Sequence, residues 1–355
     1  MKINITYNRE VLDNGDFITS ADVISDTKIA KENMSFTLDG EKLKIHNIEE
    51  IEKGYHVEFE LTEKLSTLQF DADKFINNVV LPQIIFSVKG FNPDINVNYQ
   101  EDSFIKDFKM KIFQTDKIQL SYLIYENGNK DTKRPLVLFL HGSGERGFNN
   151  TLPLLGNDVP KTYHNYIKTN HQNAVVLVPQ ATWAPTLNGW FRKDFRKALF
   201  ELIAKVEKEY NIDKDRIYLS GLSNGASTSW YIGAHHADTF AAIIPCSGFV
   251  YGDDKQELGN MKTGRYMEVT QEEAKALASV PIWAFHSEDD PTVSVQGTRK
   301  AKSAIEEVDD SNLKVTIYPR GTVLPNPHAS WSRAYNTPEL LPWLFSQSKA
   351  KQAVK

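Results

Sequence analysis

The chain has 355 residues, of which 41% are hydrophobic and 25% charged, with a formal net charge of −5, and its length allows two domains or one large one. The weak negative charge argues against a nucleic-acid-binding protein, and the single cysteine excludes an intrachain disulfide and a cysteine-based zinc site. Apolar runs are too short for a membrane span, and the N-terminus has no apolar signal core, so we expect a cytoplasmic protein or a secreted one whose signal was removed.

Residues 1–105 are expected to form a small β-sandwich that serves as an accessory domain. They contain no tryptophan, and runs rich in Ile, Val, Phe and Tyr occur at 34–38, 42–48, 55–61 and 84–88. In the run 55–61 apolar and polar residues alternate, which is typical of a strand with one buried face. About 100 residues of this kind suggest an immunoglobulin-like sandwich, although no Cys…Trp…Cys spacing supports that label.

Residues 106–355 alternate between predicted strands and helices. Nearly continuous apolar runs, typical of strands covered on both faces, occur at 136–140, 175–178, 217–219, 241–245, 281–285 and 315–318. The clearest helix is predicted over 194–210, where apolar residues form one stripe. This alternation predicts an α/β catalytic domain with a mostly parallel sheet, helices on both faces and its site at the carboxyl ends of the strands.

The segment Gly221-Leu-Ser223-Asn-Gly225 matches the pattern G-x-S-x-G. A predicted strand precedes it and a predicted helix over 226–236 follows it, which is the context of a sharp turn that exposes a serine nucleophile. The two glycines leave room for the strand and the helix to approach closely. A glycine-rich connection with a helix-capping serine is the structural alternative, and the context favours the nucleophile.

A serine nucleophile needs a base that takes its proton and an acid that orients the base. In this type of fold they follow in the order Ser, Asp, His, and Asp290 and His328 follow Ser223 in that order, each after a predicted strand. Spacing alone does not choose between Asp290 and its acidic neighbours Glu288 and Asp289. His328 could be an ordinary loop histidine, but its position makes it the best candidate for the base.

Two backbone N–H groups are expected to stabilise the negative oxygen that forms on attack. One is that of Asn224, directly after the nucleophile. The other comes from the loop after the strand 136–140, where Ser143 is the first choice and Gly144 the second. A phosphate-binding glycine loop is the alternative, but the pattern G-x-x-x-x-G-K-[ST] is missing. We expect no metal and no organic cofactor, because this chemistry requires neither.

These segments give residues 106–355 a resemblance to the α/β-hydrolase family. The chain looks most similar to polysaccharide-directed esterases of the feruloyl and acetyl-xylan type and to proteins labelled predicted peptidases, some of which carry an N-terminal immunoglobulin-like domain. The matching segments are 138–147, 178–180, 211–225, 240–245, 281–286, 290–291 and 328–331. The resemblance implies the catalytic acid at Asp290. Asn224, Ala226 and Ser287 depart from the family's usual Met, Gly and Gly, and these departures bear on the substrate rather than on the reaction.

Three further features concern the substrate. Residues 249–279 are interpreted as a lid or pocket wall, with a plain surface excursion as an equal alternative. Trp190 and Trp331 are expected to bind substrate, because aromatic faces suit sugar rings or a phenolic acyl group, and loop packing is the alternative for each. Cys246 is expected to pack within a buried strand.

Taken together, the residues and the resemblance predict a serine carboxylesterase that hydrolyses short acyl or aromatic esters, including carbohydrate-linked ones, through an acyl-enzyme. A serine peptidase on the same triad is the enzymatic alternative. A carbohydrate-binding protein with a vestigial triad is the alternative from another class. The expected partner is a small-molecule or carbohydrate-linked ester, with no nucleic acid and no membrane.

Overall fold

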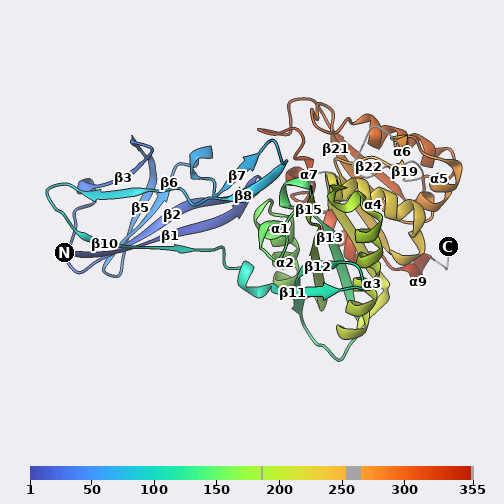
Figure 1. The fold of residues 1–355 in the computed structure, drawn as a ribbon, viewed down its shortest axis with the longest axis horizontal. Helices are drawn as coiled ribbons and strands as arrows, with labels where there is room; N and C mark the ends of the chain where they lie inside the picture. Colours follow the sequence, from blue (N-terminus) through green and yellow to red (C-terminus); the bar gives the residue numbers. More distant parts are fainter. Residues whose placement is uncertain (185–186, 253–264, 353–355) are drawn as a thin grey trace. The chain divides into compact units, whose positions relative to one another are not determined.

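The computed structural model describes residues 1–184, 187–252 and 265–352, which form two compact units (Figure 1). The smaller unit comprises Met1–Asp71, Asn77–Lys106 and Leu155–Asp158. The larger unit comprises Ala72–Ile76, Asp107–Leu154 and Val159–Lys355. The division into two domains after residue 105 stays a prediction, because compactness alone does not show that either segment folds separately.

The smaller unit contains two β-sheets that share one core and a separate two-stranded sheet, β7-β8. A five-stranded sheet has the order β10-β1-β2-β6-β5 and a three-stranded sheet the order β4-β3-β9. Ile5 from the first sheet and Phe36 from the second are fully buried in the same apolar cluster, as in a sandwich. This all-β unit is compatible with the immunoglobulin-like domain that the sequence predicts. Its strands are β1 (Lys2–Leu12), β2 (Gly15–Ser25), β3 (Met34–Leu38), β4 (Glu41–Lys42), β5 (Ile45–Ile51), β6 (Gly54–Phe59), β7 (Leu68–Asp71), β8 (Ile76–Val79), β9 (Ile85–Val88) and β10 (Asp94–Gln100).

The larger unit is built around an eight-stranded sheet with the order β11-β12-β14-β13-β17-β18-β21-β22. The pairs β11·β12 and β12·β14 are antiparallel, and the remaining pairs are parallel, so the sheet is mostly parallel as predicted. The strands are β11 (Lys109–Gln114), β12 (Gln119–Asn127), β13 (Arg134–Leu140), β14 (Ala174–Gln180), β17 (Ile212–Leu222), β18 (Ala242–Cys246), β21 (Ile282–Ser287) and β22 (Leu313–Tyr318). Two short antiparallel strand pairs lie outside this sheet, β15 (Trp183–Ala184) with β16 (Leu187–Asn188) and β19 (Tyr251–Gly252) with β20 (Arg265–Tyr266).

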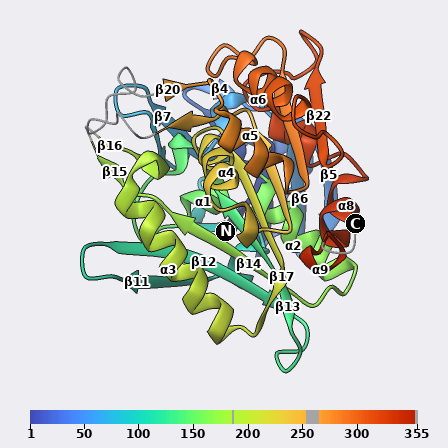
Figure 2. The same ribbon diagram turned by 90° about the vertical axis from the view of Figure 1, so that its right-hand side faces the viewer.

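Alternate residues of β17 face opposite sides of the sheet. Ile217 and Leu219 lie in a core that α3 (Lys193–Glu209), α4 (Asn224–His235), α5 (Gln271–Ala278) and α6 (Gln296–Glu306) help to form. On the other face, Tyr218 Oη donates to the carbonyl oxygen of Gln347 at 3.0 Å. Helices α2 (Val159–Thr169), α7 (Ser330–Ala334) and α8 (Leu340–Ser346) lie on that face (Figures 1 and 2). The sheet is therefore covered by helices on both faces, which confirms the predicted α/β-hydrolase fold class.

The remaining elements are short. They are α1 (Leu152–Leu155), α9 (Lys349–Gln352) and the 3-10 helices η1 (Lys31–Asn33), η2 (Glu63–Leu65), η3 (Ile105–Asp107), η4 (Ser143–Glu145), η5 (Gly189–Phe191) and η6 (Ala237–Thr239). Among the described residues, no helix is long and apolar enough to cross a membrane. The neighbouring strands β13, β17, β18 and β21 are parallel, so their carboxyl ends meet at one edge of the sheet. The loops that leave this edge carry the candidate site.

Candidate active site

Ser223 lies at the turn between β17 and α4. Its φ of 52° and ψ of −113° place it in a strained backbone conformation, which is a recurrent feature of functional turns. The Ser223 N–H donates to the carbonyl oxygen of Cys246 at 2.9 Å, which ties the turn to the end of the neighbouring strand β18. The turn thus holds the Ser223 side chain at the edge of the sheet, at the start of a helix.

The two glycines of the turn allow a very close backbone approach. A Cβ atom on Gly221 would lie 2.4 Å from the carbonyl oxygen of Gly225. A Cβ atom on Gly225 would lie 2.0 Å from the carbonyl oxygen of Leu140, at the end of β13. Neither position has space for any larger residue, as the motif requires.

The structure brings the three predicted catalytic side chains into contact. His328 Nε2 lies 2.9 Å from Ser223 Oγ, and His328 Nδ1 lies 2.7 Å from Asp290 Oδ2. Because an ionised carboxylate only accepts, Nδ1 carries the ring proton and Nε2 is left to accept the proton of the serine hydroxyl. This is the arrangement of a hydroxyl, a base and an orienting acid.

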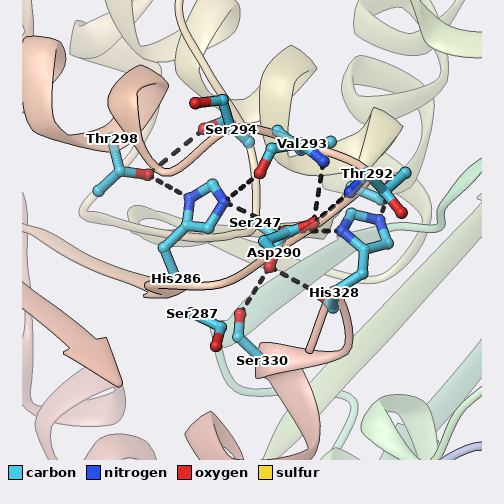
Figure 3. A network of polar contacts seen from close by, with 12 residues as sticks. Ser247, His286, Ser287, Asp290, Thr292, Val293, Ser294, Thr298, His328 and Ser330 are labelled. Carbon is cyan, nitrogen blue, oxygen red and sulfur yellow. Dashed lines mark hydrogen bonds and ion pairs between the residues drawn. The ribbon is translucent and has the colours of Figure 1, made fainter. Parts of the chain in front are cut away.

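The Asp290 carboxylate is fully buried and ionised. Its Oδ1 accepts hydrogen bonds from the backbone N–H groups of Thr292 at 2.8 Å and Val293 at 2.9 Å (Figure 3). Burial alone would raise the pKa of Asp290, but donors from His286, His328 and Val293 outweigh it and hold that pKa well below its usual range. Asp290 therefore keeps its charge at neutral pH.

The acidic neighbours of Asp290 have other partners. Asp289 accepts hydrogen bonds from Ser287 Oγ and from the backbone N–H of Gly321, both at 2.8 Å. Glu288 pairs with Arg299 of α6 at 2.5 Å. Of the three acids that spacing alone left open, Asp290 is the one in contact with His328.

Two serines fix the main chain at His328. Ser247 follows β18 with a φ of 59°, and its Oγ donates to the carbonyl oxygen of His328 at 2.9 Å (Figure 3). The same Oγ lies 2.7 Å from Ser330 Oγ. Both serines were missed in the sequence, although the position of Ser247 just after a predicted strand was a usable signal.

The loop after β13 runs beside the nucleophile. A Cβ atom on Gly142 would lie 3.5 Å from Ser223 Cβ, so this loop passes close to the Ser223 side chain. Ser143 is the first residue of η4, and its carbonyl oxygen accepts from Arg146 Nε at 2.8 Å. Asn224, the first residue of α4, follows Ser223 directly. Both candidate oxyanion donors lie at the site, and their role stays a prediction.

Trp190 packs against the loop that follows β13. It is fully buried in η5, and its Nε1 donates to the carbonyl oxygen of His141 at 3.1 Å. The backbone N–H of Trp190 donates to Asn224 Oδ1 at 3.2 Å, so the unusual asparagine after the nucleophile ties η5 to the turn. These contacts give Trp190 a role in loop packing, and its role in substrate binding stays a prediction.

Trp331 lies against the candidate base. Its ring meets that of His328 edge to face, with centroids 5.3 Å apart. Its Nε1 is buried and has no hydrogen-bond partner within the described residues. A substrate role for Trp331 stays a prediction, as does the lid over residues 249–279, of which 253–264 lie outside the described residues.

The described part of the chain has no evident metal site, and its cysteine is buried. It contains no cluster of three or more His, Cys, Asp or Glu residues that could hold a metal ion. Cys246 is buried at the end of β18, and burial raises the pKa of its thiol.

Comparison with known proteins gives consistent matches. A model of the family described as Phospholipase/Carboxylesterase matches residues 127–322. A bifunctional acetylxylan esterase/xylanase of Neocallimastix patriciarum is 27% identical over 175 residues, which are 49% of this chain and 22% of that protein. A solved thermostable esterase is similar with a TM-score of 0.75 at 23% identity, over 97% of this chain and 99% of the other. A ferulic acid esterase is similar with a TM-score of 0.53 at 17% identity, over 67% of this chain and 97% of the other.

Proposed function

Because the chain belongs to the phospholipase/carboxylesterase family of α/β-hydrolases, we propose that it is a serine carboxylesterase whose triad is Ser223, His328 and Asp290. The chain is a hydrolase of the esterase type, and its predicted resemblance to esterases of the feruloyl and acetyl-xylan type is confirmed. The observation that carries the triad is the position of His328, whose two ring nitrogens reach Ser223 Oγ at 2.9 Å and Asp290 Oδ2 at 2.7 Å.

The geometry supports a two-step reaction. Ser223 Oγ attacks the ester carbonyl while His328 Nε2 takes the hydroxyl proton. His328 then donates that proton to the leaving alcohol, and an acyl-enzyme remains on Ser223. Water attacks the acyl-enzyme with the same base, which releases the acid and restores the serine. Asp290, ionised and fixed, holds the ring proton on Nδ1 and stabilises the imidazolium in both steps.

The oxyanion of each tetrahedral intermediate needs donors that are already in place. We assign them to the backbone N–H groups of Asn224 and Ser143. Support comes from the closeness of the Gly142 backbone to Ser223 and from the contacts that hold η4 and η5 in place. The start of α4 adds the favourable end of a helix dipole at the same point.

The proposed substrates are short acyl or aromatic esters, including esters attached to carbohydrate. Support comes from the acetylxylan esterase/xylanase and the ferulic acid esterase among the similar proteins, and it is an argument from likeness. A direct test can identify the acid and the alcohol part of the preferred ester. It compares turnover of p-nitrophenyl esters of increasing acyl length, methyl ferulate, acetylated xylan and a short peptide.

The first experiment measures turnover of that panel by the wild-type chain, by Ser223→Ala and by the pair Asp290→Asn and Asp289→Asn. We expect ester hydrolysis that Ser223→Ala abolishes. Asp290→Asn should lower kcat by about 10⁴-fold, because the amide favours the wrong histidine tautomer. Asp289→Asn is the matched control, and it should stay within about threefold of the wild type.

Two results would contradict the proposal. Peptide cleavage without ester turnover would make the chain a peptidase on the same triad. Equal losses of kcat in Asp290→Asn and Asp289→Asn, at equal stability, would remove the specific role of Asp290. An acyl adduct on Ser223, seen as a mass increase after mixing with ester at low pH, would support the acyl-enzyme directly.

A further inference from the structure

A second buried histidine lies against the Asp290 carboxylate. His286 belongs to β21, and Figure 3 shows it and His328 on either side of Asp290. His286 Nε2 lies 3.2 Å from Asp290 Oδ2, the same oxygen that His328 Nδ1 reaches at 2.7 Å. The His286 side chain is 0% exposed and makes its contacts within the protein. The reaction described above uses Asp290 and His328 and gives His286 no part.

The partners of the His286 ring determine which nitrogen carries its proton. Nε2 lies 2.9 Å from the carbonyl oxygen of Val293 as well as near Asp290, and both groups are acceptors, so Nε2 carries the proton. Nδ1 lies 2.8 Å from Thr298 Oγ1 on α6, whose hydroxyl can donate to it. A neutral ring therefore satisfies both nitrogens and places no net charge in a fully buried site.

His286 completes the set of donors around the carboxylate. Asp290 Oδ1 accepts from the backbone N–H groups of Thr292 and Val293, and Oδ2 accepts from His328. The His286 Nε2–H, which donates to the Val293 carbonyl oxygen at 2.9 Å, also lies 3.2 Å from Oδ2. A carboxylate has about four lone-pair sites, and here three of them accept hydrogen bonds while the N–H of His286 lies near the fourth. Rotation of the carboxylate would break several of these bonds at once. The oxygen that orients the base is therefore held in one place.

We propose that His286 is a positioning residue of this esterase, a neutral N–H donor that fixes Asp290 and moderates the negative charge that Asp290 presents to His328. The inference rests on the proposed triad. A donor on Oδ2 withdraws part of the charge that would otherwise stabilise the His328 imidazolium. Without that donor the imidazolium is more stable, so the base stays protonated up to a higher pH and the acid limb of the pH profile moves upward.

Other charged groups near Asp290 have partners of their own. In the described part of the chain, the titratable side chains that contact Asp290 are His286 and the proposed base. Asp289, from the same loop, is bound to a serine and a backbone N–H, and Glu288 is paired with Arg299 of α6. A change at His286 therefore acts on the base mainly through Asp290.

The test compares two amides that differ by one methylene group. His286→Gln places an amide N–H near the position of Nε2 and keeps a donor for Asp290. His286→Asn places its amide near the position of Nδ1, which is short of the carboxylate. The measurements are kcat/KM for p-nitrophenyl acetate between about pH 5 and pH 9, followed in a pH-stat, and the Tm of each variant.

We expect His286→Asn to lose about tenfold in kcat/KM, less than the hundredfold that a 1 Å misplacement can cost. Its acid limb should move up by about 0.5 to 1 pH unit, less than the roughly 1 to 2 units that a whole hydrogen bond to a charged group is worth, because His286 acts on the base only through Asp290. His286→Gln should keep the limb at the wild-type pH and recover most of the activity. If His286→Asn does not fold, His286→Phe makes the same comparison, since it keeps the ring shape without an N–H donor.

His164 provides a matched control, because it is a buried histidine whose Nε2 lies 2.8 Å from Asp107 Oδ2. His164→Asn should lower Tm and leave the acid limb unmoved. The inference fails if His286→Asn behaves in the same way, or if the Gln variant moves the limb as far as the Asn variant. The variant Ser223→Ala distinguishes a failure of this inference from a failure of the proposed function. Full turnover by Ser223→Ala would contradict the proposed triad, whereas an unmoved acid limb in His286→Asn would contradict only the role of His286.

Discussion

Burial determines the charge of His141, the first residue of the loop after β13. His141 is 0% exposed, and burial lowers its pKa from about 6.5 to about 3. The neutral ring donates from Nδ1 to the carbonyl oxygen of Gly142 at 2.6 Å and accepts at Nε2 from the backbone N–H of Ala181 at 3.0 Å. A neutral His141 therefore links the loop after β13 to the loop after β14.

This lowered pKa predicts a pH dependence of stability. Between about pH 6.5 and pH 3 the unfolded chain binds a proton at His141 that the folded chain does not. The contribution of neutral His141 is complete above about pH 6.5 and is lost as the pH falls, at up to about 1.4 kcal/mol per pH unit. His141→Gln, which keeps an acceptor but does not titrate, should lose less stability between about pH 6.5 and pH 4.5.

The measurement is the free energy of unfolding of the wild type and His141→Gln in urea at several pH values. Above about pH 7 the two curves should run parallel, because His141 is neutral in both folded and unfolded chains. Parallel curves down to about pH 4.5 would contradict the prediction, since they would mean that His141 does not resist protonation. Both chains carry the same acidic groups, so the contribution of those groups to the pH dependence cancels in the difference between the two curves.

Residue order in the sequence pointed to the side chains of the proposed triad but not to the residues that hold them in place. Ser223, Asp290 and His328 follow a recognisable order, and the family resemblance rather than the spacing placed the acid at Asp290. The structure shows why spacing could not do so, since three consecutive acids leave β21 and only their bonds separate them. No role for His286 followed from the sequence, because nothing in the residue pattern shows that it lies beside Asp290.

At the scale of elements, the turn from β17 to α4 depends on the contact of backbones rather than of side chains. The Gly225 backbone lies so close to β13 that an added Cβ would be 2.0 Å from the carbonyl oxygen of Leu140. Gly233, in the same helix, would place a Cβ 2.7 Å from Ile243 Cδ1, the flexible end of a side chain. The first clash can be relieved only by moving the strand or the helix.

Gly225→Ala should therefore destabilise the chain by about 3 kcal/mol or more, while Gly233→Ala should cost less than about 1 kcal/mol. Alanine also has the higher helix propensity, which offsets part of the cost at position 233. Urea unfolding of both variants is the measurement, with ester turnover as a second readout. If Gly225→Ala and Gly233→Ala are equally stable, α4 can shift away from β13 without cost, and the argument from the close backbone approach at Gly225 is wrong.

The strands of the larger unit were easier to predict than those of the smaller one. β13 and β14 are buried along their whole length, so their apolar runs are continuous. The long strands β1 and β2 lie outside the predicted runs, because Arg9 and Asp16 interrupt the apolar pattern. These two charges are buried and paired at 2.7 Å, a tertiary contact that no local pattern reveals.

At the scale of the whole molecule, the two units have separate hydrophobic cores. Phe36 is fully buried in the smaller unit, with Phe59 and Phe86 at ring distances of 5.1 and 4.9 Å. Phe240 is 1% exposed in the core of the larger unit, which also holds the proposed triad. Two cores in one chain allow unfolding in more than one step.

We expect Phe36→Ala and Phe240→Ala to affect different transitions in calorimetry. Each removes a buried phenyl ring and should cost about 3 to 5 kcal/mol in its own unit. Phe240→Ala should lower the temperature at which ester turnover is lost, because Ser223, Asp290 and His328 all belong to the larger unit. Phe36→Ala should lower the other transition and leave that temperature within a few degrees of the wild type. A single transition that both variants lower equally would show instead that the two cores unfold as one cooperative structure.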